Sequence, residues 1–377
     1  MKYGGIYIHI PFCIKKCPYC NFYSVTELSY INSFFKSVIK EIKSRKDKSF
    51  IANSIYFGGG TPTLIQPNII AELISAVRNN FTILPNSEIT AEANPGTINK
   101  KNLPLLKKAG INRLNIGVQS FNNSALKILN RIHTVKDAQI AYYDARNAGF
   151  SNIGIDLIYA IPGQTLKEMI KDFKKAANMS PEHISGYILT LEHRTPIYSD
   201  VMNNVLKKTG EKLQSKMFLS AVRFLKNSGY KQYEISNFAK ADQFRSAHNL
   251  KYWTGDAYKG FGPSAHSFDK KKRYWNISDI KKYIQRIDNN KTVIEQSETL
   301  TTEQKIIEFI YLGLRHLGID IKDFNFKFKA NFIANYNKAL HKLVEEKLIK
   351  IDSDKCGLTE KGMLFADYAA KMLISDL

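Results

Sequence analysis

The strongest constraint on the fold is a repeated pattern in the first 190 residues, where short apolar segments alternate with amphipathic ones. The apolar segments have the length of buried strands, and the amphipathic segments have the period of helices. Strands are predicted at 5–10, 54–57, 88–93, 113–118, 153–159 and 183–189. Helices are predicted at about 28–46, 67–80, 99–109, 122–130, 134–148 and 165–178. Six strand–helix units with right-handed connections predict an α/β fold, with a parallel sheet curled into a partial (βα)6, TIM-like barrel.

The rest of the chain divides into three further predicted parts. One more amphipathic helix at about 209–228 completes a core of residues 1–237. An intervening segment, 238–300, includes a probable linker at 278–300. Residues 301–377 contain predicted helices and a short hairpin, which favours a small helical, winged-helix-like C-terminal domain. Such domains bind nucleic acid or pack on a neighbour, and packing is favoured here because no base-reading motif is present.

Three of the four cysteines form a C-x3-C-x2-C loop, Cys13, Cys17 and Cys20, directly after the first predicted strand. Closely spaced thiolates indicate a metal site rather than disulfides in a reducing compartment. Zinc completed by His9 is one interpretation. An iron–sulfur cluster with one iron left open is the other, and it points to chemistry at that iron. The distant Cys356 is expected to be inert.

Polar residues and glycines lie in or just after the other predicted strands, with Asp156 inside the fifth and Arg131 after the helix that follows the fourth. Ligands bind at the carboxyl ends of parallel strands, so these residues are expected to share one rim with the cysteine loop. A glycine run at 58–60 lets the backbone approach a ligand closely. The candidates on this rim are Gly59, Gly60, Thr61, Glu92, Gln119, Arg131 and Asp156.

A second candidate site is the run His248-Asn249-Leu250-Lys251-Tyr252-Trp253. An imidazole beside large aromatic rings can ligate a heme iron while the rings cover the macrocycle. From chemistry alone, a hydrogen-bonded histidine in a packed aromatic cluster is the favoured alternative. His266, in a glycine-rich turn, is a weaker candidate for the same cavity.

The cysteine loop, with Tyr19 before its last Cys, resembles the signature of the radical S-adenosylmethionine (SAM) superfamily. The resemblance implies a [4Fe–4S] cluster on three Cys, with SAM on the fourth iron and cleaved to a 5′-deoxyadenosyl radical. An electron donor such as flavodoxin or ferredoxin is then expected. The glycine run is similar to the motif whose carbonyls meet the SAM amino group in that superfamily.

Longer stretches resemble the oxygen-independent coproporphyrinogen oxidase group, and the likeness covers most of the chain. It rests on the runs 7–13, 58–63, 115–121, 130–131 and 156–165. The match implies a SAM site lined by Tyr7, Tyr19, Gly59, Gly60, Thr61, Glu92, Gln119, Arg131 and Asp156. Arg131 suits the SAM carboxylate, because a guanidinium gives a two-pronged contact. Asp156 suits the ribose hydroxyls.

Two departures favour the heme-chaperone branch of this group over the oxidases. Phe22 stands where the oxidases carry a further Cys, and only about four residues precede the first predicted strand, where the oxidases have an extension. The resemblance therefore implies that the chain binds heme and passes it to an acceptor protein, with the membrane face as one place of transfer. His248, Tyr252 and Trp253 match the motif proposed for heme contact in that branch. A radical enzyme acting on a porphyrinogen or another small substrate is the first alternative.

The chain carries a formal net charge of +21, which raises a second alternative, a tRNA-modifying radical SAM enzyme. The excess is mostly Lys spread over many predicted helices, which is typical of solvated surfaces. A nucleic-acid partner is therefore not expected. The sequence has no signal-peptide pattern and no run of about 18 apolar residues, so a cytoplasmic location is expected.

Overall fold

A computed structural model describes residues 3–375. Its centre is a curved sheet in which six parallel strands lie side by side in chain order, as predicted. They are β1 (Gly4–Ile10), β2 (Asp47–Gly59), β3 (Phe81–Ala93), β4 (Arg113–Gln119), β5 (Ile153–Tyr159) and β6 (His183–Ile188). Strands β2 and β3 begin earlier than predicted, because their first residues already pair with each other, starting with Asp47 and Phe81. The sheet is open, with β12 and β7 as its end strands.

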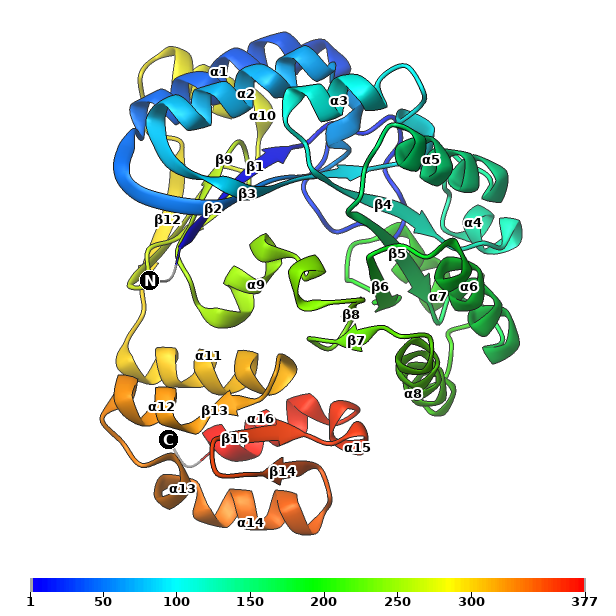
Figure 1. The fold of residues 1–377 in the computed structure, drawn as a ribbon, viewed down its shortest axis with the longest axis vertical. Coiled ribbons are helices and arrows are strands. Elements are labelled where there is room, and N and C mark those ends of the chain that lie inside the picture. The colour runs from blue at the N-terminus through cyan, green and yellow to red at the C-terminus, as the bar shows by residue number, and fades with distance from the viewer. Residues whose placement is uncertain (1–2, 376–377) are drawn as a thin grey trace.

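The predicted helices cover the outer side of the curved sheet (Figure 1). They are α1 (Ile31–Ser44), α2 (Pro67–Asn80), α3 (Leu103–Ala109), α4 (Asn123–Ile128), α5 (Val135–Asn147) and α6 (Leu166–Met179). The predicted capping box of Thr165 and Glu168 is present at the start of α6. Gly110 has a left-handed backbone after α3, the conformation that favours Gly at a helix end. Single 3-10 turns occur at Leu28–Tyr30, Pro62–Leu64, Pro95–Thr97 and Asp242–Phe244.

The sheet continues past both ends of the predicted barrel. On the β1 side it adds β9 (Tyr258–Phe261), β10 (His266–Phe268), β11 (Lys272–Asn276) and β12 (Ile294–Thr299). On the β6 side it adds β8 (Asn237–Ala239) and β7 (Lys231–Gln232). Residues 278–300, expected to form a linker, instead contain α10 (Ile280–Asp288) and the end strand β12. The expectation of a linker was wrong at these residues. Strand β12 forms by pairing with β11, and a local sequence pattern does not reveal such a contact.

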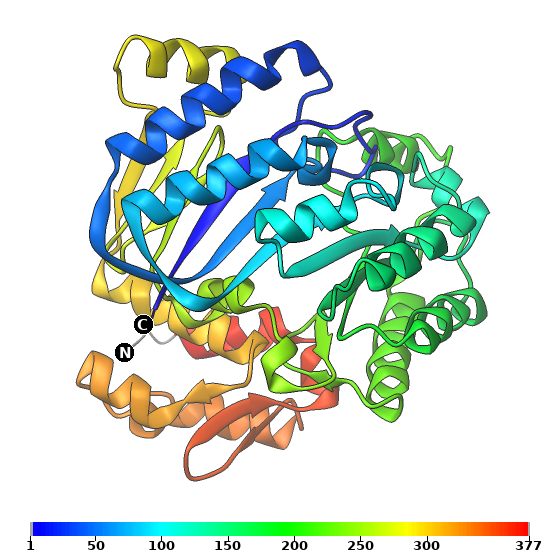
Figure 2. The same cartoon turned by 45° about the horizontal axis from the view of Figure 1, so that its top comes forward.

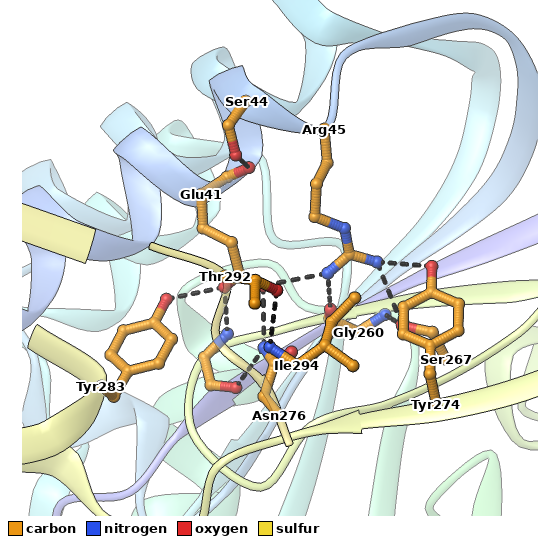
Figure 3. Close-up of polar contacts among 11 residues, drawn as sticks. Glu41, Ser44, Arg45, Gly260, Ser267, Tyr274, Asn276, Tyr283, Thr292 and Ile294 are labelled. Atoms are coloured by element: carbon orange, nitrogen blue, oxygen red, sulfur yellow. Dashed lines mark hydrogen bonds and ion pairs between the residues drawn. The ribbon is translucent and has the colours of Figure 1, made fainter. Parts of the chain in front are cut away.

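A buried polar network attaches this extension to α1 (Figure 3). Glu41 is 1% exposed, and its carboxylate accepts hydrogen bonds from Arg45 Nη1 at 2.9 Å and Tyr283 OH at 2.6 Å. It also accepts from Asn276 Nδ2 at 2.7 Å and from the Gly262 amide at 2.9 Å. The Arg45 guanidinium in turn donates to the Gly260 carbonyl, to Ser267 Oγ and to Tyr274 OH. One carboxylate therefore ties α1 to β9–β11 and to α10.

Replacing Glu41 with Ala is expected to lower the free energy of unfolding by about 3–5 kcal/mol, because Arg45 would keep a buried charge without its partner. Tyr283→Phe, which removes only one hydrogen bond to Glu41, is expected to cost about 1 kcal/mol. Denaturant unfolding of the three proteins measures both values. Equal stability of Glu41→Ala and the parent would contradict this role for the network.

Helix α9 (Ala247–Thr254) lies on the inner side of the curved sheet, where it contacts β1 and β2 on one side and α11 on the other (Figure 1). Its first amides, of Ala247 and His248, donate to the Glu88 carboxylate at 3.0 and 3.3 Å. This negative charge at the helix start favours the observed position of α9. Helices α7 (Pro196–Met202) and α8 (Glu211–Asn227) follow β6.

The C-terminal residues form a second core below the sheet (Figure 2). Its helices are α11 (Thr302–Arg315), α12 (Ile321–Phe328), α13 (Phe332–Asn335), α14 (Asn337–Glu345), α15 (Glu360–Met363) and α16 (Ala366–Ile374). They pack on an antiparallel sheet in the order β13 (Ile319–Asp320), β15 (Lys355–Leu358) and β14 (Ile349–Ile351). Cys356 is buried there, and burial raises the pKa of its thiol to about 12, which agrees with an inert role. Within residues 3–375, every helix is too short or too polar to cross a membrane.

Candidate functional site

A cavity of about 740 Å³ opens at the carboxyl ends of β1–β6 and reaches inward to α9. Its volume is within the usual range for a site that encloses one small ligand. The cavity brings together every predicted site residue except Trp253 and the weaker candidate His266. The lining includes Tyr7, Cys13, Cys17, Tyr19, Cys20, Gly59, Gly60, Thr61, Glu92, Gln119, Arg131, Asp156, His248 and Tyr252.

The cysteine loop is closed at its base by backbone hydrogen bonds. The Cys13 amide donates to the Val25 carbonyl at 2.9 Å, and the Val25 amide donates to the Pro11 carbonyl at 2.7 Å. A further bond of 3.1 Å joins the Cys20 amide to the Cys17 carbonyl. The thiols are free and half-buried, and burial raises the pKa values of Cys13 and Cys20. The loop therefore presents three cysteines to one cavity while its ends stay fixed to the sheet.

The surroundings of the thiols fit a group held by soft thiolates. Arg131 Nη1 lies 3.3 Å from Cys17 Sγ, and Thr61 Oγ1 lies 3.8 Å from Cys13 Sγ. A cation and a hydroxyl donor both stabilise negative charge on sulfur. Among residues 3–375, no three His, Cys, Asp or Glu side chains already form a compact metal-binding group. The fit to an iron–sulfur cluster thus rests on the donor type and on the shared cavity.

His9 is not available as a fourth ligand in this arrangement. Its Nδ1 is hydrogen-bonded to Tyr7 OH at 3.0 Å and its Nε2 to the Tyr23 carbonyl at 2.9 Å. Burial lowers the pKa of His9 to about 4, so the ring is neutral. One nitrogen therefore holds the cysteine loop through Tyr23 and the other bonds to Tyr7 on β1, so both are in use, which disfavours the zinc interpretation.

The glycine run packs tightly against the start of the cysteine loop. Gly59 has a positive φ of 108°, and a Cβ there would lie 2.5 Å from the His9 ring. A Cβ on Gly60 would lie 2.6 Å from the Phe12 carbonyl oxygen. Only Gly fits at both positions, so this run sets how closely β2 approaches the loop.

Two buried carboxylates face the cavity from β3 and β5. Glu92 accepts from Tyr56 OH at 2.8 Å and from the Gly59 amide at 3.3 Å. Asp156 accepts a short hydrogen bond from Asn115 Nδ2. Burial raises the pKa of Glu92 to about 7 and that of Asp156 to about 6. Without a ligand, both carboxyl groups thus exchange protons near neutral pH.

Arg131 and Gln119 complete the rim. The Arg131 guanidinium donates to Tyr19 OH at 3.3 Å and to the Gly117 carbonyl at 3.1 Å, in addition to its contact with Cys17. Gln119 has a positive φ of 66° at the end of β4, an uncommon backbone for a residue other than Gly. These contacts hold a fixed positive charge beside the thiols.

Helix α9 forms the inner wall of the cavity. His248 is 1% exposed, with Nδ1 hydrogen-bonded to Ser54 Oγ at 3.1 Å and Nε2 to Tyr252 OH at 3.0 Å. Burial lowers the pKa of His248 to about 3, so the imidazole is neutral. Trp253 does not line the cavity, because it lies one residue past Tyr252 on the helix. The weaker candidate His266 is also wrong for this cavity, since it is exposed on β10 and stacks on Trp275.

Sequence reasoning missed several polar residues deeper in the cavity. Tyr56, Arg113, Asn115, His183 and Ser185 all line it and are all largely buried. A signal was present, since polar residues recur at every second position of β3, β4 and β6. A parallel strand with both faces in an apolar core would instead be apolar throughout.

Comparisons with known proteins identify the family. A family model described as the Radical SAM superfamily matches residues 7–176, and a model of the HemN C-terminal domain matches residues 300–365. The heme chaperone HemW of Lactococcus lactis subsp. lactis (strain IL1403) is 33% identical over 383 aligned positions, covering 100% of this chain and 99% of the relative. The chain belongs to the HemW family. HemW of Bacillus subtilis (strain 168) is likewise 33% identical, covering 98% of this chain and 99% of the relative.

The HemW relationship agrees with the fold. The structure of HemN from Escherichia coli, titled as coproporphyrinogen III oxidase and a radical SAM enzyme, superposes with a TM-score of 0.85 at 23% identity. The match covers 100% of this chain and 91% of HemN. This likeness shows that the chain has the α/β radical SAM fold, as predicted from the strand–helix units.

Proposed function

We propose that this chain binds heme and passes it to an acceptor protein, and that it holds a [4Fe–4S] cluster and SAM at the rim of its cavity. One observation carries the proposal. A single cavity gathers the three thiols, Arg131 and two buried carboxylates in a chain that is similar over its whole length to heme chaperones. The cluster would be held by the thiolates of Cys13, Cys17 and Cys20.

In this proposal SAM lies against the residues of the rim. The Arg131 guanidinium pairs with the SAM carboxylate, and Asp156 accepts hydrogen bonds from ribose hydroxyls. Glu92 lies opposite the positive charge of the ligand, because a buried carboxylate favours a cation nearby. Backbone carbonyls near Gly59 and Gly60 accept from the amino group. Tyr7, Tyr19, Thr61 and Gln119 form the remaining walls.

SAM affinity is expected to fall as the pH is lowered from 8 to 6. The pKa of Glu92 is raised to about 7 by burial, so the carboxylate that faces the cation is progressively protonated over this range. Protonated Glu92 loses its attraction for SAM, and the loss approaches about tenfold per pH unit below that pKa. Equilibrium dialysis of SAM across this range measures the effect. Glu92→Gln should bind weakly with a flatter pH dependence, whereas a slope equal to the parent's would contradict the role of Glu92.

For heme, we propose contact with the α9 wall, at His248 and Tyr252, with Trp253 as a weaker candidate. Iron ligation by His248 Nε2 requires its 3.0 Å hydrogen bond to Tyr252 to open. Tyr252 is 38% exposed and so has room to move. His248→Ala is then expected to shift the heme Soret band and to weaken heme binding about tenfold or more, where tenfold corresponds to about 1.4 kcal/mol of binding free energy.

His183→Ala is a matched control for this change. His183 is also buried in the cavity, and its Nε2 is hydrogen-bonded to Tyr233 OH at 2.8 Å. This variant should keep the parent's heme spectrum. An unchanged spectrum and affinity in His248→Ala would mean that His248 only packs.

A porphyrinogen oxidase is the alternative, and Phe22 argues against it. This side chain is 70% exposed at the mouth of the cavity, where the resemblance expects a further Cys in the oxidases. Incubation with coproporphyrinogen III, SAM and dithionite is expected to give no decarboxylated product. Catalytic decarboxylation would overturn the proposal in favour of the oxidase.

We further propose a cytoplasmic protein with a radical SAM core at 1–237, an intervening segment at 238–300 and a HemN-type domain at 301–377. The match of residues 300–365 to the HemN C-terminal domain supports the last boundary. A one-electron donor such as flavodoxin or ferredoxin would reduce the cluster. Exposed Lys15 and Lys16 beside the thiols suit an acidic donor of this kind.

A further inference from the structure

Tyr56, on β2, lies between Glu92 and helix α9. The sequence predicted no role for it. Its side chain is nearly buried, and its hydroxyl donates to Glu92 Oε1 at 2.8 Å. Its ring stacks on His248, with centroids 5.2 Å apart and planes 28° apart. It also stacks on Tyr7, with centroids 6.2 Å apart. Tyr56 thus hydrogen-bonds to Glu92 and stacks on the α9 histidine at the same time.

We propose that Tyr56 is a positioning residue of the SAM site: its hydroxyl orients the Glu92 carboxylate toward the ligand and favours its ionised form. The inference rests on the proposed SAM site. A phenol that donates to a carboxylate stabilises the charged form more than the neutral one. The second bond, from the Gly59 amide to Oε2 at 3.3 Å, leaves the carboxylate plane fixed by one donor on each oxygen.

The groups around Glu92 make this side-chain donor important. Asp156 on β5 disfavours a second negative charge, and burial acts in the same direction. Arg113 on β4 favours the ionised form from a greater distance. Tyr7 on β1 and Tyr252 on α9 are neutral phenols, because burial raises the pKa of both. Tyr56 is therefore the side chain that offsets burial by direct contact.

The ring of Tyr56 connects helix α9 to the Glu92 carboxylate, because it stacks on His248 and carries the hydroxyl that bonds to Glu92. A displacement of His248 would move the ring on which it stacks, and the hydroxyl bonded to Glu92 is part of that rigid ring. The first amides of α9 are held by Glu88, in a contact that does not involve Tyr56. Removing only the hydroxyl of Tyr56 should therefore leave α9 in place and remove the side-chain hydrogen bond to the Glu92 carboxylate.

The test is the pH dependence of SAM binding in Tyr56→Phe, measured by equilibrium dialysis on anaerobically reconstituted protein. We expect an affinity about tenfold weaker at pH 7, with the midpoint of the pH dependence moved upward by about one unit, since one hydrogen bond to a charged group is lost. Tyr230→Phe is the matched control. It also loses a buried hydroxyl, which donates to the Pro181 carbonyl at 2.8 Å outside the cavity, and should bind SAM like the parent.

Two results would overturn the inference. One is a parent-like affinity and midpoint in Tyr56→Phe. The other is an affinity that is lower by the same factor at every pH, which would indicate a packing role only. In both cases the proposed SAM site itself would stand, provided that the parent binds SAM and Glu92→Gln binds it more weakly. Absence of SAM binding by the parent would instead remove the proposed site, and the inference with it.

Discussion

Cys17→Ala is expected to abolish the [4Fe–4S] absorbance of anaerobically reconstituted protein and to reduce bound iron to near zero. Cys17 is the middle one of the three proposed ligands, and its sulfur also lies 3.3 Å from Arg131 Nη1. Two remaining thiolates cannot hold a cluster that normally takes Cys ligands on most of its irons. Iron and sulfide analysis with absorbance spectroscopy measures the loss.

Cys356→Ala is the matched control for Cys17→Ala. Cys356 is buried in the C-terminal core and remote from the cavity, so this variant should reconstitute like the parent. A full cluster with four irons in Cys17→Ala would show that the loop is not the cluster site. Loss of iron in both variants would indicate general unfolding instead.

Arg131→Ala is expected to weaken SAM binding about 10- to 100-fold while leaving the iron content unchanged. A charge-assisted hydrogen bond contributes roughly 1.5–3 kcal/mol, and each 1.4 kcal/mol is tenfold in affinity. Arg131 is held by Tyr19 and by the Gly117 carbonyl, so its guanidinium is already oriented before the ligand arrives. Isothermal titration with SAM on reconstituted protein measures the change.

Arg131→Lys separates charge from geometry at this site. A lysine keeps the positive charge but not the planar fork, so an affinity between those of the parent and Arg131→Ala is expected. Parent-like SAM affinity in Arg131→Ala would remove Arg131 from the site. Loss of iron together with SAM would show that Arg131 instead supports the cluster loop.

The six central strands could be predicted because each is a local run of apolar residues, such as 153–159, next to a helix with clear start and end signals. The strands that extend the sheet at its two ends could not be predicted in this way. Strand β12 (Ile294–Thr299) is exposed at every residue and has no apolar pattern, so only its pairing with β11 makes it a strand. The Glu41 network that secures this region joins residues more than 200 positions apart, which no local pattern encodes.

The rim residues could be predicted because each lies in a short recognisable motif in or near the carboxyl end of a strand, or, for Arg131, after the next helix. The residues deeper in the cavity could not be predicted in this way. The role of Tyr56, for example, depends on Glu92 and His248, which come from other elements. The sequence placed His248 beside aromatic rings correctly, but it could not show that both ring nitrogens are already hydrogen-bonded. It also grouped Trp253 with Tyr252, although the helical turn separates their directions.

The most direct test of the central claim is a heme titration of the anaerobically reconstituted protein, followed by transfer of the bound heme to an apo-heme protein. The account predicts saturable binding near one heme per chain, with a Soret band that moves to the acceptor's position upon mixing. Failure to bind heme under these conditions, with cluster and SAM both present, would contradict the assignment as a heme chaperone.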